Sequence, residues 1–343
     1  TPDEADRLRK IVAKKAGTET FARYRERFYE GARKKGVGGG VIDTIWEMIC
    51  SFQGYSFCKP HSASYVQVSF QSAWLKAHHP AQFMAAVLSN YGGFYTTQAY
   101  ISEAMRMGLK ILPPDVNKST VAYTAAGRTI RVGFRQIKGL SSRGARAVVA
   151  QREEEGDYHT MEEFLERTGC SEDDGEKFIL SGALDTISGE QNRSRLFWEL
   201  RRFFRNGDRG ETVPPLTPYS SGEIIRLQYR SLGYLTDCHP ITLVTANRKR
   251  PSLRAVYLDR SIGKKVALHG WCVTSKTVST ATGAAMEFVT FEDETGIFET
   301  VFFPDVYARC AMPLSLQSAF LVGGIVTEEF GVAVLEVESI VKL

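Results

Sequence analysis

Residues 262–343 carry the pattern that most limits what this chain can fold into. Five runs there alternate apolar and polar residues or are continuously apolar, as β-strands do: VALHGWCVTSKTV, MEFVTFEDE, IFETVFF, AFLVGGIVTEE and VAVLEVESI. The segment PDVYARCAM lies between the third and fourth runs, and its proline stands at a position where helices commonly begin. The residues therefore predict five strands with one short helix between the third and the fourth.

This order of elements is that of an OB-fold, a five-stranded β-barrel, and we assign residues 261–343 to it. A five-stranded sandwich gives similar spacing and is the alternative for this region. Aromatic side chains on such a barrel can stack the bases of a single strand. The candidates are Trp271, Phe288, Phe298 and Phe302, although alternation predicts that many of them face the barrel core.

The preceding two-thirds of the chain is predicted to be mostly helical. Residues 1–115 form a helical segment with breaks at GVGGG and near Gly54. Residues 116–205 begin with VAYTAAGRTIRVGF, which predicts a β-hairpin, and continue with helical runs. Residues 206–260 are a linker rich in Gly, Pro and Ser with one short helix near residues 222–229. The predicted fold class is multidomain α+β, helical first and barrel last.

The composition is that of a globular chain without a membrane segment. It is 43% hydrophobic over 343 residues, no apolar run reaches the length of a membrane span, and the N-terminus is charged. The six cysteines are dispersed and form no CxxC pair, which favours reduced thiols. These features predict a cytoplasmic location and no membrane partner.

Charge is distributed unevenly along the chain, although the net charge is only +4. Residues 1–115 contain 15 Lys and Arg against 10 Asp and Glu, whereas residues 260–343 contain 6 against 10. Basic surfaces attract phosphates. A nucleic-acid partner should therefore be held mainly by the front of the chain.

The stretch IKGLSSRGARAVV joins an apolar run to an alanine-rich helical run through a turn bounded by two glycines. Glycine lets the backbone approach a neighbour, and the first amides of the following helix lack intrahelical partners. Such a helix start suits a phosphate oxygen. The pattern is that of a helix-hairpin-helix motif, and a plain helix–loop–helix turn is the alternative. The predicted DNA-backbone contacts are Lys138, Gly139, Leu140, Ser142, Arg143, Gly144 and Ala145.

A second turn of the same kind supports the first, because helix-hairpin-helix motifs commonly act in pairs. In GEKFILSGALDTISGEQNRSRL, Ser181 and Gly182 again separate two helical runs. The pair is predicted to grip a DNA backbone without reading its bases.

Two basic segments near the N-terminus are candidates for holding a nucleotide triphosphate, whose charge several fixed cations must offset. LRKIVAKK places Lys10 and Lys14 four residues apart on one helix face. In FCKPHSASYVQVSF, a lysine and a histidine precede serines that can cap a helix. The alternatives are a solvated helix face and a capped helix with a surface lysine. The predicted nucleotide-phosphate contacts are Arg9, Lys10, Lys14, Lys15, Lys59 and His61.

Residue types that bind metals form no recognisable cluster in the sequence. The histidines are isolated or adjacent at a helix end, and no close set of aspartates has the DxD spacing that holds two magnesium ions. Asp173 and Asp174 are predicted to lie in a solvated turn, and so is the EDE run at 292–294. We therefore expect neither a metal site nor catalytic residues in this chain.

Five spaced motifs resemble, in the same order, landmarks of the bacterial replicative DNA polymerase III alpha subunit. They are GYSFCKPHSASYVQVSFQSAWLKAHHPAQFMAAVLS, MRMGLKILPPDVN, IKGL, LSGALD and LGYLTDCHPI. The resemblance covers essentially the whole chain and corresponds to the C-terminal part of that family. It implies fingers over 1–115, a tandem helix-hairpin-helix module over 116–205, a linker over 206–260 and an OB-fold over 261–343.

In that family, basic residues of the fingers lie near the triphosphate of the incoming nucleotide. The resemblance therefore implies the same role for Arg9, Lys10, Lys14, Lys15, Lys59 and His61. Lys10 stands where the family commonly has an arginine, and lysine lacks the bidentate fork of arginine.

The resemblance also implies a reaction and a set of partners. The full-length protein would be a DNA-directed DNA polymerase, a nucleotidyltransferase, whose Mg²⁺-binding aspartates belong to a palm domain upstream of this chain. The chain alone is then expected to be inactive and to bind no cofactor itself. Its implied partners are the primer–template duplex, the single-stranded template, the incoming dNTP and other replisome subunits.

The sequence leaves other interpretations open. The linker RNGDRGETVPPLTPYSSGE contains no Gln-x-x-x-Phe-type motif for a sliding clamp. A non-catalytic DNA-binding accessory protein with the same modules is the main rival hypothesis. An RNA-handling OB protein is more remote, because paired hairpins suit a DNA duplex.

Overall fold

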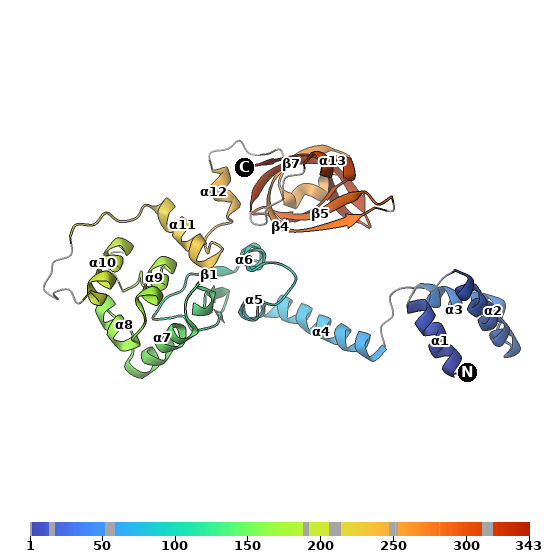
Figure 1. The fold of residues 1–343 in the computed structure, drawn as a ribbon, viewed down its shortest axis with the longest axis horizontal. Coiled ribbons are helices and arrows are strands. Elements are labelled where there is room, and N and C mark those ends of the chain that lie inside the picture. Colours follow the sequence, from blue (N-terminus) through green and yellow to red (C-terminus); the bar gives the residue numbers. More distant parts are fainter. Residues whose placement is uncertain are drawn as a thin grey trace. The chain divides into compact units, whose positions relative to one another are not determined.

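The computed structural model describes residues 2–13, 18–51, 59–187, 192–205, 214–246, 251, 253–280, 282–310 and 318–343. The chain divides into two compact units, Thr1–Trp74 and Leu75–Leu343, and each is described by itself (Figure 1). Within the described ranges, none of the helices combines the length and the apolar character needed to cross a membrane.

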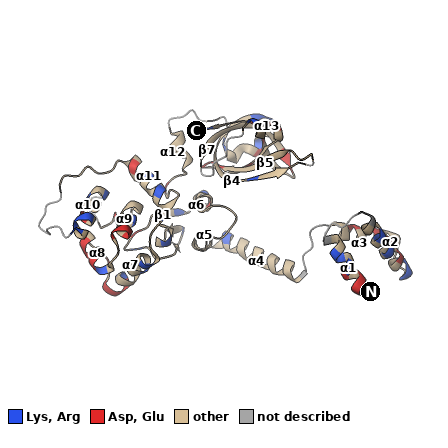
Figure 2. Ribbon diagram, viewed as in Figure 1, with Lys and Arg blue, Asp and Glu red and all other residues tan. Residues whose placement is uncertain are grey.

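The first unit is helical, as the sequence predicts. It contains α1 (Pro2–Ala13), α2 (Thr18–Lys34), α3 (Gly39–Ser51) and most of α4 (Lys59–His78). The break between α2 and α3 coincides with the predicted one at GVGGG, where Gly36 has a φ of 78°. The ring of Trp46 packs against the rings of Phe21 and Phe28, with distances between ring centroids of 5.3 and 5.4 Å. Helix α4 is almost without charged residues (Figure 2), and the rings of Tyr65 and Phe70 are exposed.

The second unit opens with a helical part built around a small sheet. Its helices are α5 (Pro80–Ser89), α6 (Thr97–Arg106), α7 (Ser142–Glu155), α8 (Met161–Thr168), α9 (Glu172–Ser181), α10 (Arg193–Phe204), α11 (Ser221–Leu232) and α12 (Ile241–Thr245), with 3₁₀ turns η1 (Phe134–Gln136) and η2 (Ala255–Ser261). The predicted hairpin is confirmed as β2 (Thr124–Ala126) and β3 (Thr129–Arg131). A third strand, β1 (Lys110–Leu112), pairs in parallel with β3, and the sequence reasoning missed it.

Local signals in the sequence fix where these helices begin and end. Ser141, Thr160 and Ser171 cap α7, α8 and α9 by accepting a hydrogen bond from the backbone N–H three residues on. Helix α11 begins with a capping box between Ser220 and Glu223. Helices α8, α9 and α11 end at a glycine in the left-handed conformation.

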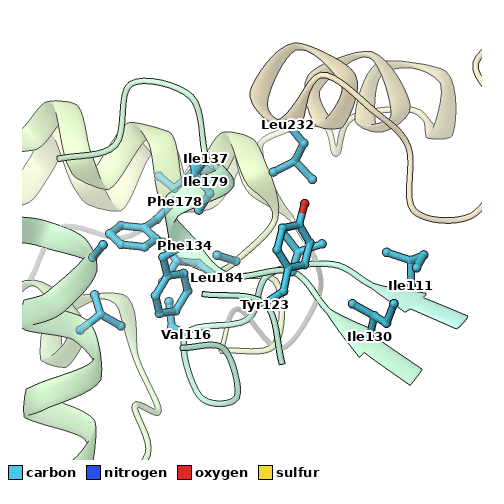
Figure 3. Close-up of a cluster of buried hydrophobic side chains, with 14 of the residues drawn as sticks. Ile111, Val116, Tyr123, Ile130, Phe134, Ile137, Phe178, Ile179, Leu184 and Leu232 are labelled. Atoms are coloured by element: carbon cyan, nitrogen blue, oxygen red, sulfur yellow. The ribbon is translucent and has the colours of Figure 1, made fainter. Parts of the chain in front are cut away.

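One apolar core holds the helical part together (Figure 3). The ring of Phe178 lies edge-on to those of Phe134 and Phe164, at 5.5 and 5.4 Å. Leu232 enters the core from α11, and Figure 3 shows it above Tyr123. The buried hydroxyl groups of Tyr123 and Tyr234 share a hydrogen bond of 2.6 Å, and burial raises the pKa of both phenols. The C-terminal end of α11 is thereby fixed to the helical part.

The C-terminal region is a closed barrel, which confirms the prediction. Its strands are β4 (Lys265–Ser279), β5 (Ala285–Glu292), β6 (Ile297–Phe302), β7 (Ala319–Glu329) and β8 (Val332–Lys342), in the spatial order β4-β5-β6-β8-β7. The predicted helix is α13 (Pro304–Arg309), between β6 and β7. Among the described strands of the barrel, β6 and β8 are the pair that runs in parallel, and the barrel core includes Leu268, Phe291, Phe298, Phe302 and Phe320.

Gly133 makes a close backbone contact just before the turn that carries the predicted DNA contacts. A Cβ at this position would lie 2.3 Å from the backbone carbonyl of Ala122. We expect Gly133→Ala to lower the free energy of unfolding by more than about 1 kcal/mol, because backbone cannot move aside as a side chain can. Urea unfolding measures this loss. Gly222→Ala is the control, since its Cβ would meet nothing closer than 3.8 Å and should be neutral; equal effects would contradict the expectation.

Candidate nucleic-acid interface

The turn between η1 and α7 carries the first group of predicted DNA contacts. Lys138, Gly139, Ser142 and Arg143 are exposed, whereas Gly144 and Ala145 are buried behind them and Leu140 is half-buried. Gly139 has a φ of 78°, which a residue with a Cβ rarely adopts. The structure therefore brings the charged and the small residues of the motif together on one exposed turn.

The turn is held in place by a buried carboxylate from α9. Asp174 accepts hydrogen bonds from the Ser141 N–H at 2.9 Å and from the Ser141 hydroxyl at 2.6 Å. The Ser141 hydroxyl in turn accepts from the Gly144 N–H at 2.8 Å. The prediction of a solvated turn is thus wrong for Asp174, which is 5% exposed. Its partner lies 33 residues earlier, so no local pattern shows the contact.

The second glycine of the motif is explained by the same carboxylate. A Cβ on Gly144 would lie 2.6 Å from Asp174 Oδ2. This glycine therefore makes room for a protein neighbour, while Gly139 provides the backbone conformation of the turn.

Most backbone amides of the turn are already bonded, but three are not. The N–H groups of Lys138, Leu140, Ser141, Gly144 and Ala145 donate to Ser231 O, Ile137 O, Asp174 Oδ1, Ser141 Oγ and Ser141 O. In the part of the chain that the structure describes, the N–H groups of Gly139, Ser142 and Arg143 have no acceptor. Two of these three open α7, where the helix dipole favours an anion.

The same segment, residues 135–146, contains exposed cations. Arg135, Lys138, Arg143 and Arg146 are exposed, and none forms an ion pair with any residue within the described ranges. The side chain of Lys177 also reaches the turn, since its Cε lies 3.0 Å from the position that a Cβ on Gly139 would occupy. The amine of Lys177, however, donates a hydrogen bond of 2.8 Å to the Asp173 carboxylate. That hydrogen bond raises the pKa of Lys177. The surface is therefore positive and open to solvent.

The second predicted turn differs, because it is buried. The Gly182 N–H donates to Ile179 O at 3.0 Å, and the Ser181 hydroxyl donates to Phe178 O at 2.9 Å. The guanidinium of Arg193 covers Gly182 and pairs with Asp185 through contacts of 2.9 and 2.7 Å. Ser181 and Gly182 thus complete the end of α9 and are buried there.

The predicted nucleotide-phosphate contacts belong to the first unit. Arg9 and Lys10 come together around Asp6, at 2.9 Å each, and their hydrogen bonds lower the pKa of that carboxyl. Lys14 and Lys15 lie outside the described residues. Lys59 is the first residue of α4, and the exposed ring of His61 lies 4.6 Å from that of Tyr65.

The candidate stacking residues of the barrel separate into two groups. Trp271, Phe298 and Phe302 are buried, as the alternation predicts, whereas Phe288 is 39% exposed. Phe330, at the tip between β7 and β8, is 98% exposed and was not among the candidates. Its exposure could have been predicted from its place in a turn beside a glycine, Gly331.

In the EDE run, the prediction of a solvated turn is wrong for Glu292 and Asp293, whereas Glu294 is exposed as predicted. Glu292 is 0% exposed, and its carboxylate lies within 3.0 to 3.3 Å of His239 Nε2, the Ser102 hydroxyl and Arg106 Nη1. Asp293 is also buried and accepts from the Ala255 N–H at 2.8 Å. These contacts tie the end of β5 to α6 and to the segment before α12.

The described ranges contain no cluster of metal-ligating side chains. No three His, Cys, Asp or Glu side chains there lie close enough together to hold an ion.

Comparison with known proteins agrees with this geometry. A family model described as a helix-hairpin-helix motif matches residues 108–196, which confirms the predicted motif. The chain is 31% identical to the DNA polymerase III subunit alpha of Thermus aquaticus, over 93% of the chain and 28% of that protein. It is 29% identical to the error-prone DNA polymerase of Bdellovibrio bacteriovorus, over 100% of the chain and 35% of that protein.

A third relative, the error-prone DNA polymerase of Corynebacterium diphtheriae, is 28% identical over 99% of the chain and 33% of its own length. The chain thus spans between 28% and 35% of the length of these three relatives. Over nearly all of its own length, the chain is homologous to one part of the bacterial DNA polymerase III alpha subunits and error-prone DNA polymerases.

Proposed function

We propose that the exposed turn at residues 138–143 and the start of α7 hold the sugar-phosphate backbone of a DNA duplex. The observation that carries the proposal is that the amides of Gly139, Ser142 and Arg143 and the side chains of Lys138 and Arg143 have no partner among the described residues. Contacts of this kind position a protein on DNA without reading its sequence. The helix-hairpin-helix match and the polymerase relatives support the same partner.

The test is duplex binding by the chain in which Lys138 and Arg143 are both replaced by glutamine. Glutamine keeps the aliphatic stems and removes two positive charges. Each neutralised phosphate contributes about 0.9 to the slope of log affinity against log salt concentration. We therefore expect the slope to fall by about 1.8 and the affinity at 0.1 M salt to fall roughly sixtyfold, as measured by fluorescence anisotropy on a blunt duplex.

The matched control removes two exposed arginines elsewhere, at Arg254 and Arg309. Their replacement by glutamine changes the net charge equally and should leave most of the slope intact. An equal loss in both variants would mean that only overall charge matters, and it would refute the assignment of the turn.

We propose that the chain acts within a DNA-directed DNA polymerase, as its relatives are named. In this proposal Arg9, Lys10, Lys14, Lys15, Lys59 and His61 face the triphosphate of the incoming nucleotide. Asp6 already offsets part of the charge of Arg9 and Lys10. These two residues therefore contribute to triphosphate binding only if Asp6 moves away from them or if further cations take part. The catalytic carboxylates and their Mg²⁺ are proposed to lie outside this chain. A non-catalytic accessory protein remains the rival, and nucleotide incorporation by the full-length protein distinguishes the two.

The barrel is proposed to make a weaker contact with the single-stranded template. Phe288 and Phe330 are exposed and suited to base stacking. The excess of acidic residues over residues 260–343 opposes strong binding of a polyanion. The duplex contact at the turn is therefore the main one.

A further inference from the structure

Helix α11 lies directly against the proposed duplex site. The Lys138 N–H donates to Ser231 O at 2.9 Å, so the last turn of α11 is bonded to the turn that precedes α7. The Lys138 side chain runs over Gly233, with its Nζ 2.9 Å from where a Cβ would be. Because Leu232 and Tyr234 are buried in the core, this contact is held firmly.

Two arginines on α11 are exposed, and one of them, Arg226, is close enough to Glu223 to contribute to the lowered pKa of that carboxyl. Arg226 and Arg230 are four residues apart, so they share one face of the helix, and Arg230 directly precedes the residue that bonds Lys138. Neither arginine has an ion-pair partner in the part of the chain that the structure describes.

The acidic residues nearby are already engaged. Glu223, the acidic residue of α11, accepts from the Ser220 hydroxyl and N–H at 2.6 and 2.8 Å, and these bonds lower the pKa of its carboxyl. On α9, Glu172 and Glu176 pair with Arg201 of α10. Figure 2 shows α11 with its acidic residue at the N-terminal end and basic residues along its length.

The spacing of the two arginines suits a nucleic-acid backbone. Four residues of α-helix rise about 6 Å. Phosphates of one DNA strand recur every ~3.4 Å along the duplex axis, so the two guanidinium groups can reach separate phosphates. Guanidinium groups also bind phosphates through paired hydrogen bonds.

We infer that α11 is a second part of the duplex-binding surface, with Arg226 and Arg230 holding phosphates beside those held by the turn at 138–143. The inference rests on the duplex binding proposed above and extends that site to a helix outside the helix-hairpin-helix match, which ends at residue 196. The segment that the sequence reasoning took as a linker thus becomes part of the binding surface.

The test compares two double variants of the 343-residue chain on one blunt duplex. In the α11 variant, Arg226 and Arg230 become glutamine; in the turn variant, Lys138 and Arg143 do. We expect the α11 variant to lose about 1.8 from the salt slope and roughly sixtyfold in affinity at 0.1 M salt, because two phosphate contacts are lost. Arg226→Lys with Arg230→Lys should restore most of the slope, since the charge returns.

Each outcome decides between the two proposals. If only the turn variant loses affinity, the role of α11 is refuted and the proposed function stands. If neither variant differs from the Arg254 and Arg309 control, both proposals fail. If the lysine variant does not recover the slope although its fold is unchanged by circular dichroism, the loss is not electrostatic and the role of α11 is also refuted.

Discussion

Replacing Glu292 by alanine is expected to lower the free energy of unfolding by about 3 kcal/mol. The reason is the burial of its partners. The carboxylate is 0% exposed and accepts from the Ser102 hydroxyl at 3.2 Å and from Arg106 Nη1 at 3.3 Å. Removing it leaves the guanidinium, whose side chain is 14% exposed, without one of its two acidic partners. A buried charge that loses its partner is among the most costly single changes.

His239 adds to this cost. Its Nδ1 accepts from the Ile241 N–H at 3.1 Å, so in the neutral ring the proton is on Nε2, which lies 3.0 Å from Glu292 Oε1. The ring is buried, and its Nε2 makes no hydrogen bond within the described residues, so removing the carboxylate takes away this close electrostatic contact and no hydrogen bond. The expected loss of unfolding free energy lies at the lower end of the range for buried ion pairs, because Arg106 still forms its ion pair with Glu103.

Urea unfolding followed by tryptophan fluorescence measures the effect, and Trp271, whose ring lies 6.3 Å from that of His239, reports on this joint. Glu294→Ala is the matched control, since this neighbouring carboxylate is exposed and should cost less than about 0.5 kcal/mol. Glu292→Gln keeps the shape and removes the charge, and it should fall between the two. Equal stability of the Glu292 and Glu294 variants would mean that the buried network contributes nothing.

Features set by neighbouring residues were predictable from the sequence. The barrel strands follow from alternation, and the turn at 138–143 follows from two glycines before a helical run. Strand β1 has only three residues, and its Ile111 pairs with Ile130 of β3. Neither the length of β1 nor its local sequence pattern therefore reveals it. Short strands depend on pairing for their existence.

Buried carboxylates could not be predicted in this way. Asp174 and Glu292 stand in acidic runs, which are usually solvated. Their partners lie 33 residues away for Ser141 and 190 residues away for Ser102. The chain must fold before these side chains meet, and a single sequence contains no sign of the encounter.

Replacing Asp174 by alanine is expected to lower the free energy of unfolding by about 2 kcal/mol, because two hydrogen bonds to a charged group are lost and Ser141 regains only part of them from water. Asp173→Ala is the control: it removes the same charge one residue away, from a side chain that is 66% exposed, and should cost less than about 0.5 kcal/mol. Urea unfolding measures both variants.

Duplex binding separates the two roles of this carboxylate. Asp173→Ala removes a negative charge beside the proposed phosphate site and leaves the Ser141 bonds intact, so it should bind the duplex slightly more tightly. Asp174→Ala removes the same charge but also releases the turn from its hydrogen bonds. Binding must then order the turn, and the conformational entropy lost in doing so lowers the affinity. We expect the second effect to dominate and the affinity to fall. If Asp174→Ala instead binds as tightly as Asp173→Ala, the turn does not need to be held in advance, and charge alone governs the contact.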